Sequence, residues 1–179
     1  MAAVKEQIVP PVFGRVLDIG CGTGDLAEWF DGCEYVGFDI NPAYIETARR
    51  RHGKRGRFFC GSVTDEGLAV EAHFDVITAI GVIHHLSDEE AAQLFCMAAR
   101  LMKVGGCLIT IDPCLVDGQS GAARLLMSMD RGRYVRPIAE YMNLAACAFA
   151  EVETDVRHDL IRIPYTHLIM RVSAPRGLR

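Results

Sequence analysis

The stretch VLDIGCGTGD, from Val16 to Asp25, constrains the fold of this chain more than any other. An apolar run leads into three glycines at alternate positions, Gly20, Gly22 and Gly24, and Asp25 follows directly. Glycine permits a tight turn, and its missing side chain lets a ligand approach the backbone. A helical apolar pattern comes next. The stretch therefore predicts a strand, a ligand-binding turn and a helix, as at the ligand crevice of an open α/β sheet.

The remainder of the chain repeats this alternation of strands and helices. The apolar patterns predict strands at 14–20, 34–39, 57–60, 73–80 and 107–111, and helices at 25–31, 41–52, 88–102 and 137–149. Gly105 and Gly106 are expected to separate the third of these helices from the strand at 107–111. Two further strands, 152–157 and 165–172, follow without a helix between them. We therefore expect one α/β domain over 1–179, with a Rossmann-like, seven-stranded, mostly parallel sheet, helices on both faces and an antiparallel C-terminal hairpin strand.

Composition excludes several classes of protein. The formal net charge is −4, with acidic and basic residues mixed along the chain, so a dedicated nucleic-acid binder is disfavoured. No apolar run approaches the ~20 residues of a membrane span, and the N-terminus lacks an apolar signal core, so we expect a cytoplasmic protein without membrane contact. The seven cysteines are scattered without a CxxC pair, which is typical of reduced, buried thiols and not of a zinc or disulfide framework.

The glycine loop does not fit a dinucleotide. The dinucleotide fingerprint requires G-x-G-x-x-G, whereas Asp25 stands where the last glycine would be. A carboxylate there disfavours a pyrophosphate and favours a cation. Asp39, 19 residues after Gly20, ends the second predicted strand, where an acid accepts hydrogen bonds from ribose hydroxyls. Together these residues indicate a nucleoside with a positively charged, phosphate-free tail, a description that S-adenosylmethionine meets.

Five segments then carry a family resemblance. VLDIGCGTG, YVGFDINPAYIETAR, FFCGSVTD, FDVITAIGVIHHLSD and LMKVGGCLITIDP follow one another over roughly residues 14–113. In this order and at this spacing they resemble the motifs of class I S-adenosylmethionine-dependent methyltransferases, and especially the small-molecule enzymes with an xHH sequence after the fourth strand. The resemblance implies S-adenosylmethionine as cofactor and S-adenosylhomocysteine as product.

The resemblance also implies which residues contact the cofactor. The loop and its supports would hold the methionine end, Asp39 the ribose and Ile40 the adenine, while Ile80 and Gly81 would lie near the transferred methyl. After Gly61 the family often has an Asp that accepts from the adenine amino group, but this chain has Ser62. Ser62, the Val63 backbone and Asp65 therefore remain alternatives for that contact. The implied cofactor set is Asp18, Gly20, Cys21, Gly22, Gly24, Asp39, Ile40, Ser62, Val63, Asp65, Ile80 and Gly81.

Two adjacent histidines are the candidates for catalysis. His84 and His85 directly follow the fourth strand, at the expected methyl site. A hydroxyl nucleophile gains from a base that titrates near neutral pH, and imidazole meets that need. Of the two, His85 is the preferred base. The alternative is that both only order this loop and touch the cofactor. A two-histidine metal site lacks a matched third ligand, so no metal is predicted.

The segment 113–136 is long for a plain connection and is predicted to form a lid over the acceptor. Its arginines could grip a carboxylate or phosphate through paired hydrogen bonds, and two tyrosines could contact the acceptor. The candidate acceptor residues are Arg131, Arg133, Tyr134, Arg136 and Tyr141. The alternative is an amphipathic helix on the sheet, with its arginines paired to neighbouring acids or solvent.

These observations together predict methyl transfer to a small-molecule or glycan-type acceptor, at oxygen. The short lead before the first strand suggests an open site, compatible with an anionic or carrier-linked acceptor, or one closed by a second subunit in a homodimer. Two alternatives remain. A nucleic-acid or protein methyltransferase is disfavoured because the [ND]PP[YF] run typical of base N-methylation is absent after the fourth strand, where IGVI stands. A non-catalytic subunit that only binds S-adenosylmethionine is the other.

Overall fold

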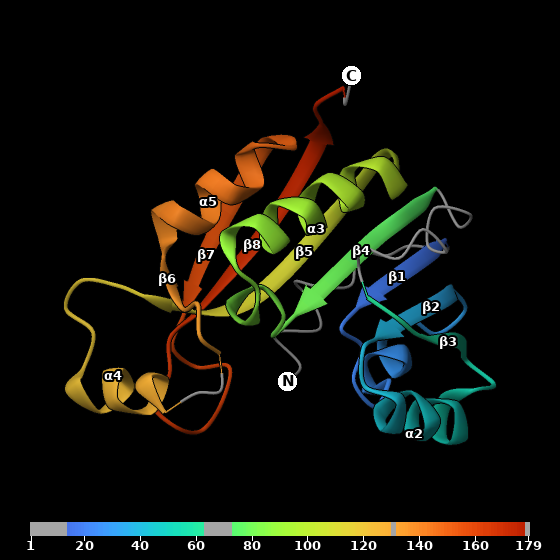
Figure 1. Cartoon of the computed structure of the whole chain (residues 1–179), viewed down its shortest axis with the longest axis horizontal. Helices are drawn as coiled ribbons and strands as arrows, with labels where there is room; N and C mark the ends of the chain where they lie inside the picture. The colour runs from blue at the N-terminus through green and yellow to red at the C-terminus, as the bar shows by residue number, and fades with distance from the viewer. Residues whose placement is uncertain (1–13, 63–72, 130–131, 178–179) are drawn as a thin grey trace.

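The computed structural model of the chain describes residues 14–62, 73–129 and 132–177 (Figure 1). These residues form one sheet with the strand order β3-β2-β1-β4-β5-β8-β7, and a short strand, β6, pairs with β5. The strands are β1 (Arg15–Ile19), β2 (Glu34–Asp39), β3 (Gly56–Cys60), β4 (Phe74–Ile80), β5 (Met102–Leu115), β6 (Arg136–Pro137), β7 (Phe149–Arg157) and β8 (His167–Pro175).

The direction of the strands confirms the predicted sheet. The strands from β3 to β5 are mutually parallel. The C-terminal strand β8 lies between β5 and β7 and is antiparallel to both. The predicted seven-stranded, mostly parallel sheet with an antiparallel C-terminal strand is therefore correct, and the two-residue β6 is an addition to it.

Helices cover both faces of this sheet. α3 (Asp88–Leu101) and α5 (Ile138–Ala146) lie side by side on one face, which is toward the viewer in Figure 1. The 3-10 helix η1 (Asp25–Trp29) and α2 (Pro42–His52) pack with the apolar side chains of the opposite face. A further helix, α4 (Gly121–Ser128), lies beyond the end of β5. No helix among the described residues is long and apolar enough to cross a membrane.

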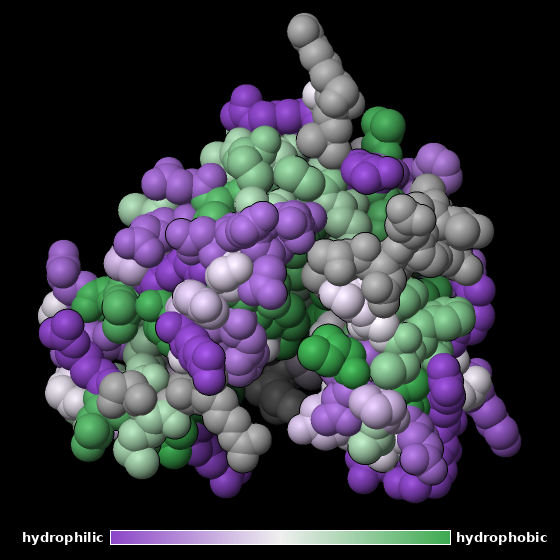
Figure 2. All heavy atoms as spheres, in the orientation of Figure 1, coloured by the Kyte–Doolittle hydropathy of each residue, from purple (hydrophilic) through white to green (hydrophobic). Residues whose placement is uncertain are grey.

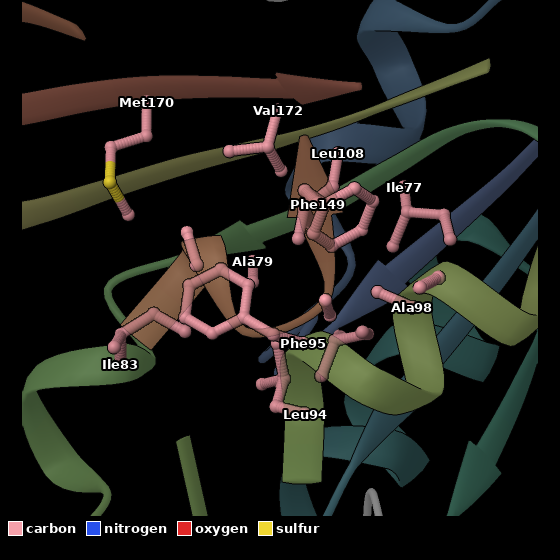
Figure 3. Packing of buried hydrophobic residues seen from close by; sticks show 14 of the residues in the cluster. Ile77, Ala79, Ile83, Leu94, Phe95, Ala98, Leu108, Phe149, Met170 and Val172 are labelled. Atoms are coloured by element: carbon pink, nitrogen blue, oxygen red, sulfur yellow. The ribbon is translucent and has the colours of Figure 1, made fainter. Parts of the chain in front are cut away.

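The larger core cluster lies between the sheet and α3. Figure 3 shows side chains of β4 and β8 meeting side chains of α3 in one layer. Phe95 of α3 is fully buried and meets Phe149 of β7 edge to face, with ring centroids 6.5 Å apart. Since burying one large apolar side chain contributes roughly 1.5–3 kcal/mol, this layer fixes α3 against the strands that carry the site.

Start signals in the sequence set the helix boundaries. Asn41 caps α2 by accepting a 3.0 Å hydrogen bond from the Ala43 amide, and Pro42 occupies the first turn. Ser87 begins α3 with a reciprocal capping box, in which Glu90 accepts from the Ser87 amide at 2.8 Å. Both helices therefore begin where the sequence predicts.

β7 begins at Phe149, within the predicted helix 137–149, and β5 and α4 differ most from the prediction. β5 begins at Met102 and runs through Gly105 and Gly106, which were expected to separate a helix from a strand. Met102 pairs with Phe74 and Cys107 pairs with Val76, so the residues between them form an irregularity within β5 and do not end the strand. A Cβ on Gly106 would lie 3.0 Å from the Asp75 carbonyl oxygen, so this glycine permits close approach of β4. The second difference is α4, a helix within the segment 113–136, for which the sequence predicts a lid first and a helix only as the alternative.

Candidate cofactor and acceptor site

The glycine loop leaves the end of β1 with three left-handed residues. Gly20, Gly22 and Gly24 have φ values of 70°, 53° and 80°. A Cβ on Gly20 would lie 2.5 Å from Val82 Cγ2, and one on Gly24 would lie 2.7 Å from Phe58 Cε1. A Cβ on Gly22 would meet nothing within 4 Å. The outer glycines thus pack against the fold, while the backbone at Gly22 borders open space that a ligand can enter.

Asp39 joins this loop to the end of β2. Its Oδ2 accepts a 2.9 Å hydrogen bond from the Gly22 amide, and its Oδ1 accepts a 2.8 Å hydrogen bond from the Asn41 amide. A carboxylate has about four acceptor positions, so both oxygens retain capacity for a ligand hydroxyl. The next residue, Ile40, is 77% exposed, which is unusual for isoleucine and provides an apolar platform beside the carboxylate.

Asp18 lies beneath the loop and is only 3% exposed. The Tyr35 hydroxyl donates to its Oδ2, and the Thr78 hydroxyl donates to its Oδ1 at 2.7 Å. Burial raises the pKa of Asp18 to about 6, against the lowering effect of these two hydrogen bonds. These hydrogen bonds join β1 to the strands on either side of it, β2 and β4. Cys21, the other side chain predicted here, is buried, and its amide donates to the Phe38 carbonyl at 2.8 Å.

A cleft of about 830 Å³ lies beyond the ends of β4 and β5. Figure 2 shows a recess in the surface between the parts formed by α4 and by α2, on the side where the carboxyl end of β4 lies. Ile80 and Gly81, the residues predicted near the transferred methyl, line the cleft. Its other described lining residues are Asp25, Leu26, Glu28, Trp29, His84, Ile111, Pro113, Leu160, Ile161, Ile163, Tyr165 and His167.

The two histidines have different surroundings. His84 lies in the 3-10 turn Ile83–His85, is 5% exposed and lines the cleft. Asp112 of β5, which is itself buried, accepts from His84 Nδ1 at 2.8 Å and from the His84 amide at 3.2 Å. His85 is exposed, is not among the described residues of the cleft, and lies beside His84 with ring centroids 4.0 Å apart. Of the two histidines, His84 is the one that meets a carboxylate and lines the cleft, whereas the sequence favoured His85 as the base.

Two residues of the predicted acceptor set are structural. Arg136 is 4% exposed and donates to the carbonyl oxygens of Ile83 and Leu86, at 3.2 and 2.7 Å, and to Asp88 Oδ1 at 2.7 Å. Tyr141 is fully buried, and its hydroxyl donates to the Pro113 carbonyl at 2.9 Å. Arg136 therefore joins β6 to the turn after β4 and to α3, and Tyr141 joins α5 to β5.

The remaining predicted site residues either do not line the cleft or lie outside the described residues. Arg133 and Tyr134 are exposed, and neither is among the described residues that line the cleft. Of the described part of 113–136, only Pro113 lines it. Ser62 is half-buried and follows β3. Val63, Asp65 and Arg131 lie outside the described residues.

Several residues of the site were missed from the sequence. Asp112 stands in the motif LITIDP, directly after the predicted strand 107–111, and that position was the available signal. Trp29 lies in the short helix that follows the glycine loop. Leu160, Ile161 and Ile163 lie in the connection between β7 and β8, where no periodicity marks them as lining a cleft.

Comparisons with known proteins agree with this geometry. A family model described as a methyltransferase domain matches residues 16–106. The chain belongs to the class I S-adenosylmethionine-dependent methyltransferases. A ubiquinone biosynthesis O-methyltransferase of Thiobacillus denitrificans is 34% identical over 102 residues, which cover 54% of this chain and 43% of that protein. A malonyl-[acyl-carrier protein] O-methyltransferase of Legionella pneumophila is 33% identical over 55% of this chain and 37% of that protein.

This methyltransferase domain therefore spans about two-fifths of the length of the curated relatives that it matches. Among solved structures, a TehB-like SAM-dependent methyltransferase from Corynebacterium glutamicum superposes with a TM-score of 0.70. The superposition covers 97% of this chain and 86% of the other, at 17% identity. At that identity the likeness concerns the fold.

The residues of the glycine loop fit the methyl donor of this family. The open backbone at Gly22 would face the methionine end, Asp39 offers acceptors to a ribose diol, and exposed Ile40 offers apolar surface to an adenine ring. The chemistry of these residues therefore fits S-adenosylmethionine.

Proposed function

We propose that this methyltransferase transfers the methyl group of S-adenosylmethionine to a hydroxyl oxygen of a small-molecule acceptor. The observation that carries the proposal is the His84–Asp112 pair, in which His84 lines the cleft together with Ile80 and Gly81. Both relatives are O-methyltransferases by name, which supports transfer to oxygen. When bound, the cofactor supplies a methyl group on a positively charged sulfur.

The protein contributes position and proton removal. Asp112 accepts from Nδ1, so the neutral ring carries its hydrogen on Nδ1 and Nε2 is the basic nitrogen. The second hydrogen bond, from the His84 amide to the same carboxylate oxygen, fixes the backbone beneath the ring. A hydroxyl held in the cleft at His84 can therefore pass its proton to Nε2 as its oxygen attacks the methyl carbon. An acceptor that covers the apolar walls of the cleft would exclude water from the reacting oxygen.

The test measures release of S-adenosylhomocysteine with a panel of neutral phenols and alcohols. In His84→Gln we expect kcat to fall by about 10²–10⁴-fold, the usual contribution of a positioned base, while the dissociation constant for S-adenosylmethionine changes less than threefold. Asp112→Asn should lower kcat with little change in the KM of the acceptor, because it misorients the base and leaves the walls of the cleft intact.

His85→Gln is the matched control, because His85 is the exposed neighbour of His84. Its kcat should stay within threefold of the native value. Full activity of His84→Gln would refute the base assignment. Tight binding of S-adenosylmethionine without turnover of any acceptor would instead favour a non-catalytic binding subunit.

A further inference from the structure

We propose that the methyl acceptor is an apolar, ring-containing molecule that carries no anionic group, and that the β7–β8 connection, residues 158–166, selects it. This inference rests on the proposed function, because it names the acceptor class for the same cleft. The β7–β8 connection thereby takes the role that the sequence analysis predicted for the arginine-rich segment 113–136.

The β7–β8 connection presents apolar side chains to the cleft. Leu160, Ile161 and Ile163 line it, and the two isoleucines are 43% and 49% exposed. η1 contributes Leu26 and Trp29 to the same lining. Exposed isoleucine side chains in a concave site gain by contact with an apolar ligand. A cleft with such walls therefore favours an acceptor that covers them.

The charge of the cleft disfavours an anion. Asp25 and Glu28 line it, with side chains 70% and 62% exposed, and no Lys or Arg is among its described lining residues. Arg51 lies 3.8 Å from Asp25, and His52 lies 3.4 Å from Asp25 and 3.9 Å from Glu28, but neither residue lines the cleft. A carboxylate, sulfonate or phosphate on the acceptor would meet two acids without a lining Lys or Arg from the described chain.

The chemistry of the lining also indicates a ring. Trp29, Tyr165, His84 and His167 all contribute ring systems to the cleft, and the rings of Tyr165 and His167 lie 5.0 Å apart. Aromatic side chains favour stacked or edge-to-face contact with another ring. A flat acceptor that bears a hydroxyl would contact these rings while its oxygen lies near His84.

The experiment compares naphthalene-2,3-diol with its 6-sulfonate, which has the same rings and hydroxyls and one added negative charge. Affinity is measured by calorimetry on the full chain. Quenching of Trp29, the single tryptophan of the chain, locates binding at the cleft. We expect the neutral diol to bind at least tenfold more tightly than the sulfonate.

Two variants test the assignment to these residues. The double variant Ile161→Asp, Ile163→Asp should weaken diol binding at least tenfold and leave S-adenosylmethionine affinity within twofold. Val104→Asp, at an apolar side chain that is 99% exposed and outside the described lining, should change neither affinity. Glu28→Lys should reduce the ratio of diol affinity to sulfonate affinity at least threefold. This change leaves the apolar side chains of the cleft in place.

Sulfonate binding as tight as diol binding would overturn the proposal, as would diol affinity unaffected by the double variant. Failure of both compounds to bind would overturn it too. None of these outcomes involves turnover or the cofactor, so they test the acceptor class independently of the proposed methyl transfer. In particular, methyl transfer to an anionic acceptor with a weakly bound diol would leave the function intact and remove the acceptor class.

Discussion

Neighbouring residues of this methyltransferase domain differ in environment more than their sequence suggests. His84 and His85 are adjacent, yet the first is buried against Asp112 and the second is exposed. The 3-10 turn Ile83–His85 holds the two rings side by side, with centroids 4.0 Å apart, and His84 is the one that meets Asp112. At this scale the identity of a residue limits its chemistry, and its hydrogen-bond partner decides which chemistry it performs.

Asp18 gives a prediction about pH at the same scale. Its pKa is raised by burial from 3.8 to about 6, so the folded protein holds a proton that the unfolded chain releases. The contribution of Asp18 to stability is therefore complete below pH 4 and is lost as pH rises through 6. For a pKa shift of this size, the free energy of unfolding that is lost between these pH values is about 3 kcal/mol.

Urea unfolding of native protein and Asp18→Asn between pH 4 and 7 tests this expectation. The difference in unfolding free energy between the two proteins should decrease as pH rises from 4 to 6 and then remain level. A difference that is independent of pH would show that Asp18 is ionised throughout this range.

At the scale of elements, Arg136 connects three parts of the fold. It lies in β6 and donates to carbonyl groups of the turn after β4 and to Asp88 in the first turn of α3. Its guanidinium is also 5.8 Å from the ring centroid of Tyr141 in α5. The short β6 therefore fixes the turn that carries His84, although it pairs with β5 over only two residues.

Arg136→Lys should destabilise the protein by roughly 2–3 kcal/mol, because lysine cannot form the fork of hydrogen bonds and leaves buried carbonyls without donors. The matched control is Arg133→Lys, three residues earlier and exposed, which should change stability by less than about 0.5 kcal/mol. Both are measured by denaturant unfolding. Equal stability of the two variants would contradict the structural role of Arg136.

At the scale of the whole molecule, the strand order places the site. β1 has β2 on one side and β4 on the other, so the glycine loop, Asp39 and the turn with His84 gather at one edge of the sheet. This is the position at which connections diverge to opposite faces, and ligands bind there in open α/β sheets. A ligand at this edge contacts several elements at once and should stabilise the domain as a unit.

S-adenosylmethionine at about 100 times its dissociation constant should therefore stabilise the domain by about 2.7 kcal/mol, or raise its Tm by roughly 5–10 °C. Asp39→Ala should lose most of this shift, because the substitution removes the ribose acceptor and the anchor of the Gly22 amide. Scanning calorimetry with and without S-adenosylmethionine measures the Tm shift of both proteins. A full shift in Asp39→Ala would contradict the ribose assignment.

Much of the fold and of the cofactor loop could be predicted from the sequence. Strand and helix periodicity, the Asn41 and Ser87 caps and the alternate glycines are local signals, and each corresponds to an element or turn in the structure. The extent of β5 could not be predicted, since it depends on pairing with β4 and β8. The role of Arg136 could not be predicted either, because its partners lie about 50 residues away in the chain.

The sequence by itself determined the sheet, the glycine loop and the family, because apolar periodicity and backbone freedom act over a few neighbouring residues. Only the tertiary structure decided which histidine meets a carboxylate and which segment borders the cleft. Asp112 reaches His84 across 28 residues of chain, and the β7–β8 connection reaches η1 across more than 100. Such contacts depend on how the whole sheet packs, and no local pattern encodes them.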